Sequence, residues 1–132
     1  MTPDPVPVNI PLLGNRERDY LARCIETGWI SSEGPFVKEF EEKFSRHIGR
    51  QHGIAVSSGT AALDCAMAAL DLGPGDEVIL PTLTIISCAS AIVRTGATPV
   101  TVDSLQDVWN MDPRQIEGQI TPRTKAIMIV HL

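Results

Sequence analysis

Ile54-Ala55-Val56-Ser57-Ser58-Gly59-Thr60, continued by alanine-rich residues as far as Leu70, is the segment that identifies the class of fold. The three apolar residues predict a short buried strand, and Ser57-Ser58-Gly59 predicts a tight turn. Residues 60–70 predict a helix that ends by Gly73. A strand, a turn and a helix in direct succession are typical of an α/β fold.

The same alternation continues along the rest of the chain. Further strands are expected at 77–80, 98–102 and 125–130, with helices ending near Gly96 and spanning 113–119, the latter capped by Asp112. Strands that alternate with helices predict a mostly parallel sheet with right-handed helical crossovers. Residues 126–130 are all apolar and would need cover on both faces in a central position, so we expect further sequence to supply it.

The amino-terminal part has a different pattern. Prolines at positions 3, 5, 7 and 11 predict an extended arm, which we assign to residues 1–14, ahead of one incomplete domain at 15–132. Helical spacing of apolar residues predicts a helix over 15–27 that stops at Gly28. A second helix is expected from Pro35 to about Ile48, closed by Gly49, with an apolar stripe that includes Phe40 and Phe44.

Composition limits the classes of function. The chain has 132 residues and a formal net charge of -5 without a basic cluster, which argues against binding to nucleic acid or to an anionic membrane. There is neither an apolar run of the ~20 residues that span a bilayer nor a signal-peptide pattern, so a cytoplasmic location is expected. Cys24, Cys65 and Cys88 are expected to be buried free thiols, and no spacing indicates a metal site.

Two segments carry hydroxyl groups at a strand-to-helix junction. Ser57 to Thr60 would place free N–H groups, a glycine and hydroxyls at a helix start, which suits a phosphate, although an ordinary N-cap is the alternative. Thr82, Thr84 and Ser87 occupy the corresponding junction one strand later, where capping is again the alternative. Asp103, at the end of the strand expected over 98–102, is interpreted as a turn residue, and a position facing the crevice beyond the strands is the alternative.

Several sequence blocks carry a family resemblance. They are Gly28-Trp29-Ile30-Ser31-Ser32, Ala55 to Leu63, Gly73 to Ile79, Pro81-Thr82-Leu83-Thr84, Gly96 to Val100, and Ile120 to Ile127. In this order the blocks resemble the amino-terminal part of the sugar aminotransferases of the DegT/DnrJ/EryC1/StrS family, from Pro11 to Leu132. The run from Val102 through Trp109 to Asp112 is most similar to GDP-perosamine synthases.

The resemblance implies a fold, a cofactor and site residues. The fold would be part of the large domain of the aspartate aminotransferase-like fold (PLP fold type I), and the cofactor would be pyridoxal phosphate. The implied cofactor-binding residues are Ser58, Gly59, Thr60, Ile85 and Ser87. Ile85 stands where the family commonly has an aromatic residue that stacks on the cofactor ring. The implied substrate neighbours are Trp29, Ser31 and Ser32, although Trp29 could instead anchor its loop by burial.

The resemblance also implies a reaction and its partners. An amino group would pass from an amino acid, usually glutamate, to a nucleotide-linked keto sugar, in an enzyme that is a homodimer at full length. The lysine that forms the Schiff base is expected beyond Leu132, because Lys38, Lys43 and Lys125 do not match its motif. The 132-residue chain alone is therefore expected to be inactive. The alternative is a non-catalytic remnant or a dimerisation module.

Overall fold

The computed structural model describes residues 5–7 and 9–131. The chain divides between Ala55 and Val56 into two compact units, and each unit is described by itself. Part of the expected amino-terminal arm, residues 1–4 and 8, lies outside the described residues. Residues 5–7 and 9–14 form neither helix nor strand.

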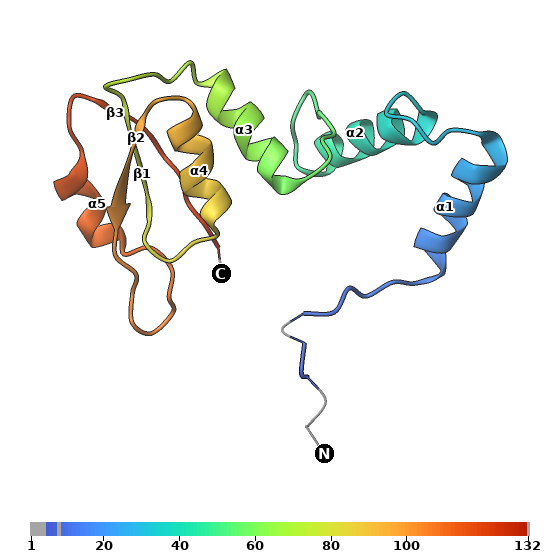
Figure 1. Cartoon of the computed structure of the whole chain (residues 1–132), viewed down its shortest axis with the longest axis horizontal. Helices are drawn as coiled ribbons and strands as arrows, with labels where there is room; N and C mark the ends of the chain where they lie inside the picture. Colours follow the sequence, from blue (N-terminus) through green and yellow to red (C-terminus); the bar gives the residue numbers. More distant parts are fainter. Residues whose placement is uncertain (1–4, 8, 132) are drawn as a thin grey trace. The chain divides into compact units, whose positions relative to one another are not determined.

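The first unit contains two helices, α1 (Asn15–Thr27) and α2 (Pro35–His47), both confirmed from the sequence (Figure 1). Gly28 ends α1 with φ 74°, a left-handed conformation that suits glycine. Pro35 begins α2 at a position where its missing N–H has no helical partner in any case. The rings of Tyr20 and Phe36 meet edge to face across the two helices, with centroids 5.4 Å apart.

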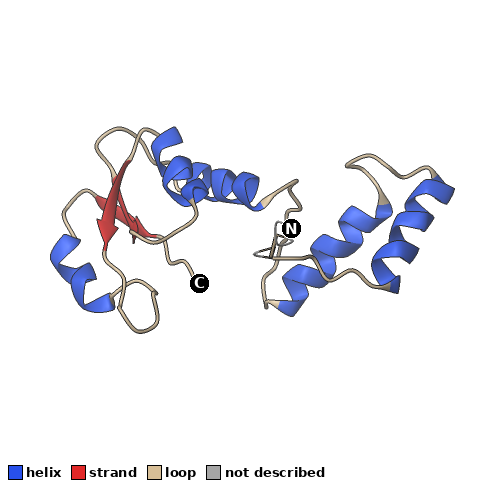
Figure 2. Ribbon diagram, turned by 60° about the horizontal axis from the view of Figure 1, so that its bottom comes forward, coloured by secondary structure: helices blue, strands red, loops and turns tan. Residues whose placement is uncertain are grey.

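The second unit is a parallel sheet with helices on both faces (Figure 2). Its strands are β1 (Glu77–Pro81), β2 (Thr98–Val102) and β3 (Thr124–Ile127), in the spatial order β2-β1-β3. Its helices are α3 (Gly59–Ala69), α4 (Ile86–Arg94) and α5 (Pro113–Gln119). The expected parallel α/β architecture is confirmed.

The core of the second unit lies on both faces of β1. Val78 and Leu80 pack with Ile92 of α4 on one face. Ile79 packs with Val102 on the other face, beneath α5. Both sets are essentially fully buried, so the alternation of side chains along a strand places apolar groups under helices on each side.

A polar network closes the amino-terminal edge of this sheet. The buried carboxylate of Glu77 accepts hydrogen bonds from Thr121 Oγ1 at 2.5 Å and from Arg123 Nε at 2.8 Å. These hydrogen bonds, together with the charge of Arg123, hold the pKa of Glu77 below its usual value. The network thereby joins the start of β1 to the residues that lead into β3.

Three sequence predictions are wrong or only partly right. Residues 54–56 are not a strand, and Ile54 is exposed, because no described strand pairs with them. The strand expected over 125–130 is β3 at 124–127. Met128 N still donates to Ile79 O, but the next donor that β1 could offer on that side is Pro81, which has no N–H. Cys65 is exposed and Cys24 is only partly buried, whereas Cys88 is buried as expected.

Candidate functional site

The start of α3 presents unused hydrogen-bond donors. Ser58 is the N-cap, and its Oγ accepts from Ala61 N at 3.2 Å. The N–H groups of Gly59 and Thr60 have no acceptor among the described residues. A Cβ at Gly59 would meet no atom within 4 Å, so this backbone is open to a ligand. The helix start can therefore accept an anion as well as its own cap.

A second helix start meets the first. Thr60 Oγ1 and Ser87 Oγ are 3.0 Å apart, although 27 residues separate them in the sequence. Ser87 lies in the first turn of α4, whose N-cap is Ile85. The contact between Thr60 and Ser87 places the amino ends of both helices beside the same small volume. Each of these ends has a partial positive charge. We call Ser58, Gly59, Thr60 and Ser87 the hydroxyl cradle.

Ile85 is the remaining expected cofactor residue. It lies two positions before Ser87, and its side chain is 65% exposed. The other two hydroxyls of this junction have local partners: Thr82 Oγ1 donates to Val102 O at 3.0 Å, and Thr84 Oγ1 lies 3.4 Å from Ile85 O. Neither Thr82 nor Thr84 caps α4, which has no side-chain cap hydrogen bond, so the capping interpretation is wrong for these two residues, while Ser87 belongs to the hydroxyl cradle.

Lys125 does not lie at the cradle's edge of the sheet. It is in the first half of β3, where its Nζ is 3.9 Å from Asp76 Oδ1, just before β1 begins. In a parallel sheet this is the amino-terminal edge, whereas residues that follow the strands lie at the carboxyl edge. That Lys125 is not the catalytic lysine stays a prediction.

The expected substrate neighbours are in the first unit. Trp29 is half-buried and packs beside Gly34, where an added Cβ would be 3.3 Å from Trp29 Cβ. Ser31 Oγ accepts a long hydrogen bond of 3.4 Å from Glu33 N. Ser32 and Ser31 are exposed. The partial burial of Trp29 supports the anchoring interpretation only in part. The substrate role of Trp29, Ser31 and Ser32 stays a prediction.

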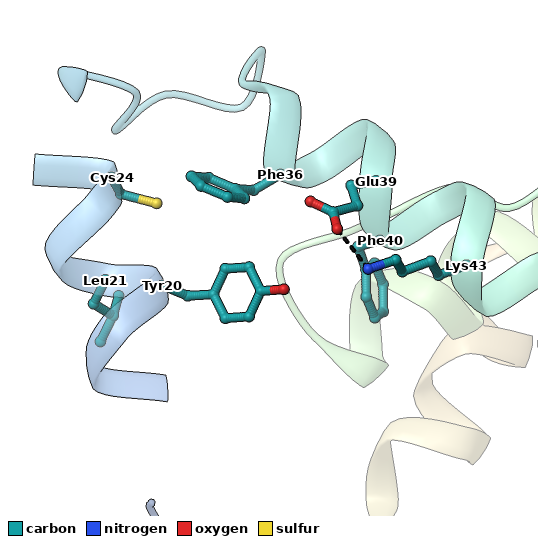
Figure 3. Close-up of a pocket in the computed structure, with 7 residues that line it drawn as sticks. All are labelled: Tyr20, Leu21, Cys24, Phe36, Glu39, Phe40 and Lys43. Carbon is teal, nitrogen blue, oxygen red and sulfur yellow. Dashed lines mark hydrogen bonds and ion pairs between the residues drawn. The ribbon is translucent and has the colours of Figure 1, made fainter. Parts of the chain in front are cut away.

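An apolar pocket between α1 and α2 was not predicted from the sequence (Figure 3). Its volume is about 380 Å³, and it is lined by Tyr20, Leu21, Cys24, Phe36, Glu39, Phe40 and Lys43. The only charged groups that line it, Glu39 and Lys43, form an ion pair with each other at 2.5 Å. The hydrogen bond and charge of Lys43 lower the pKa of Glu39. Both charged side chains of this pocket are therefore paired with each other.

A smaller pocket of about 270 Å³ also escaped the sequence analysis. It lies where β1 and β2 end and is lined by Thr82, Leu83, Asp103, Ser104 and Trp109. Asp103 Oδ1 accepts from Ser104 N at 2.8 Å, but this bond to the next residue defines no turn, and the expected turn role of Asp103 stays a prediction. The pocket depends on how the loop after β2 folds back, which no local spacing reveals.

No helix among the described residues is both long and apolar enough to cross a membrane. The same part of the chain contains no group of three or more His, Cys, Asp or Glu side chains that could hold a metal ion.

Comparison with known proteins identifies relatives of this chain. The profile of the DegT/DnrJ/EryC1/StrS aminotransferase family matches residues 11–132. A GDP-perosamine synthase of Caulobacter vibrioides is 50% identical over 127 residues, which are 96% of this chain and 34% of the relative. The spore coat polysaccharide biosynthesis protein SpsC of Bacillus subtilis is 45% identical over 126 residues, 96% of this chain and 32% of the relative.

The fold is likewise that of known aminotransferases. A sugar aminotransferase structure from Streptococcus pneumoniae, Spr1654 in its PLP-form, superposes with a TM-score of 0.83 at 37% identity. The match covers 92% of this chain and 31% of that one. The chain therefore spans about a third of the length of the proteins it matches.

Proposed function

This chain belongs to the DegT/DnrJ/EryC1/StrS aminotransferase family, and we propose that it is the amino-terminal part of an enzyme that transfers an amino group from an amino acid to a nucleotide-linked keto sugar. The cofactor of this family is pyridoxal phosphate, as the PLP-form of the Streptococcus relative illustrates. In this proposal residues 15–132 are an incomplete large domain of the aspartate aminotransferase-like fold.

The observation that carries the proposal is the hydroxyl cradle. Thr60 and Ser87 bring two helix starts together, and the N–H groups of Gly59 and Thr60 are free among the described residues. Residues 57–60 and 85–88 include no acidic side chain. A set of N–H and O–H groups without a carboxylate fits a phosphate group better than a cation.

Each residue of the hydroxyl cradle, and also Ile85, has a distinct role in this proposal. Gly59 lets the phosphate approach the backbone closely, and Thr60 and Ser87 donate from their hydroxyls. Ser58 is the N-cap of α3, and its hydroxyl oxygen accepts from Ala61 N. Ile85 offers an apolar surface to one face of the cofactor ring and keeps water from it.

When bound, pyridoxal phosphate supplies the electron sink for transfer of the amino group. The residue that pairs with the pyridine nitrogen and the catalytic lysine are expected beyond Leu132. Glutamate as amino donor, a GDP-linked sugar as acceptor and a homodimeric enzyme are parts of the same proposal. The 50% identity to a GDP-perosamine synthase supports the choice of acceptor.

Replacing the hydroxyl of Thr60 tests the cradle. In the full-length protein that carries this chain, Thr60→Val should weaken binding of pyridoxal phosphate by about 1 to 3 kcal/mol, because buried phosphate oxygens lose a donor. Titration followed by cofactor absorbance measures this. Thr101→Val, at an exposed position of β2 without a side-chain hydrogen bond, is the matched control and should bind as the wild type does. Equal affinity of the Thr60 variant and the wild type would count against the cradle.

The activity itself needs a separate assay. The full-length protein, loaded with pyridoxal phosphate, should form 2-oxoglutarate from glutamate when GDP-4-keto-6-deoxymannose is supplied. Loss of glutamate without any aminated sugar nucleotide would argue for a different acceptor. A full-length protein that does not bind the cofactor would favour the alternative of a non-catalytic binding module.

A further inference from the structure

The pocket lined by Thr82, Leu83, Asp103, Ser104 and Trp109, here called the carboxyl-edge pocket, is separate from the residues assigned to the cofactor. In open parallel sheets, ligands bind beyond the carboxyl ends of the strands. This pocket lies there, since β1 ends at Pro81 and β2 ends at Val102. Figure 1 shows the loop that follows β2 extending from that end of the sheet.

The loop that forms one wall is held by its own backbone. Leu105 N donates to Asn110 O, and Trp109 N donates to Leu105 O, both at 2.9 Å. Ser104 pairs with Met111 in an antiparallel bridge, and Asp112 N donates to Asp103 O at 2.9 Å. These bonds close the loop at its base and near its tip, so the pocket wall is preformed.

Trp109 is in an unusual position on this loop. Its φ is 61°, in the left-handed region that a bulky side chain rarely adopts, at a cost of about 1 to 2 kcal/mol. Its side chain is nevertheless 61% exposed, and its indole N–H donates to no described residue. Burial of the ring within this unit does not offset the strain. A ring held at this cost and left in water is suited to stacking on a ligand.

The polar groups beside the Trp109 ring can form hydrogen bonds to a ligand. Asp103 Oδ1 accepts from Ser104 N at 2.8 Å and also lies 3.3 Å from the hydroxyl of Thr82, whose one hydrogen is shared with Val102 O. Asp103 Oδ2 has no partner among the described residues, so one oxygen orients the carboxylate and the other is free. Ser104 Oγ is shielded from solvent and also has no described partner. Rotation about χ1 can direct this hydroxyl to a ligand.

The charge of the residues that line the carboxyl-edge pocket limits which part of a ligand can bind there. No Lys, Arg or His lines the pocket, and Asp103 adds a negative charge. A diphosphate would be repelled here. The volume of about 270 Å³ is below the range of whole-ligand pockets, about 300 to 1,000 Å³, and therefore suits a single ring.

We propose that the carboxyl-edge pocket holds an uncharged ring of the nucleotide-linked substrate, which stacks on Trp109 and donates a hydrogen bond to Asp103 Oδ2. The ring is either the base or the sugar, since both have a face that can stack and groups that can donate. This inference rests on the proposed function, because it takes its ligand from the proposed acceptor. It adds a substrate subsite outside Trp29, Ser31 and Ser32.

Removing the ring without disturbing the loop tests the subsite. Trp109→Asn takes away the indole and places a residue that tolerates the left-handed backbone. Val108→Asn changes an exposed neighbour that does not line the pocket and serves as the matched control. Calorimetry on the full-length protein would measure the affinities for GDP and for GDP-mannose, and near-ultraviolet circular dichroism would check the fold.

The two ligands distinguish the two possible rings. Trp109→Asn should weaken binding about tenfold or more, the size of a lost aromatic stack. A loss for both GDP and GDP-mannose puts the base in the pocket, whereas a loss for GDP-mannose alone puts the sugar there.

Failure of this inference is separable from failure of the proposed function. If Trp109→Asn binds both ligands as the wild type does, or if the wild type binds neither, the subsite is wrong. Cofactor titration and the glutamate assay are measured independently and decide the aminotransferase proposal. Asp103→Asn, which keeps one oxygen to accept from Ser104 N, should also weaken binding, and an unchanged affinity would remove the carboxylate from the proposal.

Discussion

The two units of this chain differ in how far they bury their apolar side chains. In residues 56–131, Val78, Ile79 and Ile92 are completely buried between the sheet and its helices. In the first unit no apolar side chain of α1 or α2 is buried, and the buried residue of α2 is Ser45. A sheet with helices on both faces closes a core from about 75 residues, whereas two helices joined by a loop leave their apolar faces in contact with solvent.

The difference concerns packing and not the regularity of the elements. The stripe of α2, which includes Phe40, Phe44 and Ile48, is amphipathic as predicted, and Phe40 stacks on Phe44 with centroids 5.5 Å apart. All three side chains are about half exposed. Amphipathic helices gain most of their stability from burial of the apolar face, so the stability of this chain should be concentrated in the second unit.

Truncation of matched isoleucines should give the largest contrast between the units. Ile79→Ala removes a fully buried side chain of β1 and should lower the free energy of unfolding by about 2 to 5 kcal/mol. Ile25→Ala removes a side chain of α1 that is 75% exposed and should change it by about 0.5 kcal/mol or less. Urea denaturation measures both. Equal losses would mean that α1 is as well packed as β1, and the contrast would be lost.

Two left-handed glycines give a smaller and sharper contrast. Gly28 ends α1 with φ 74° and has open space around a Cβ, so Gly28→Ala should cost about 1 to 2 kcal/mol, the backbone term alone. Gly96 has φ 90°, and a Cβ there would lie 3.1 Å from Pro74 Cδ. Gly96→Ala should therefore cost about 2 to 4 kcal/mol, because crowding is added to the backbone term. Thermal unfolding that ranks the two variants equally would contradict this account.

The smallest expected effect is a difference in response to acid. The pKa of Glu77 is lowered in the folded state by its hydrogen bond from Thr121 and by Arg123. Its stabilising contribution is therefore complete above the ordinary pKa of 4.5 and is lost as the pH falls through the lower, folded-state pKa. Glu77→Gln should flatten the dependence of stability on pH in this acidic range.

Glu39 in the first unit is the control for this pH experiment. Its pKa is also lowered, by the hydrogen bond and charge of Lys43, but this pair is exposed on one helix. Water and salt screen such pairs, so Glu39→Gln should leave the acid unfolding curve nearly unchanged. Identical curves for the two variants would show that burial of Glu77 adds nothing to its acid sensitivity.

Local signals were enough to predict most element boundaries. Gly28 and Pro35 bound the two helices of the first unit where the sequence placed them, and Asp112 caps α5 through its contact with Arg114 N. Caps and stops act over one turn of backbone, so the residues that set them are neighbours in the sequence. Residues 54–56 were predicted wrongly because a strand requires a partner, and pairing is not a local property.

The candidate site also has some features that the local sequence predicts and others that depend on contacts between distant residues. The Ser58-Gly59-Thr60 turn is recognisable from the sequence, because a cap and the free N–H groups beside it follow from residue types at fixed spacing. The hydrogen bond between Thr60 and Ser87 and the strained presentation of Trp109 beside Asp103 arise only after the crossover and the loop fold back. The sequence alone thus specified the parallel α/β class, the helix ends and the Ser58-Gly59-Thr60 turn that is the candidate for phosphate binding. Folding in three dimensions settled which distant hydroxyls, carboxylates and rings meet, since those contacts depend on strand order and loop closure.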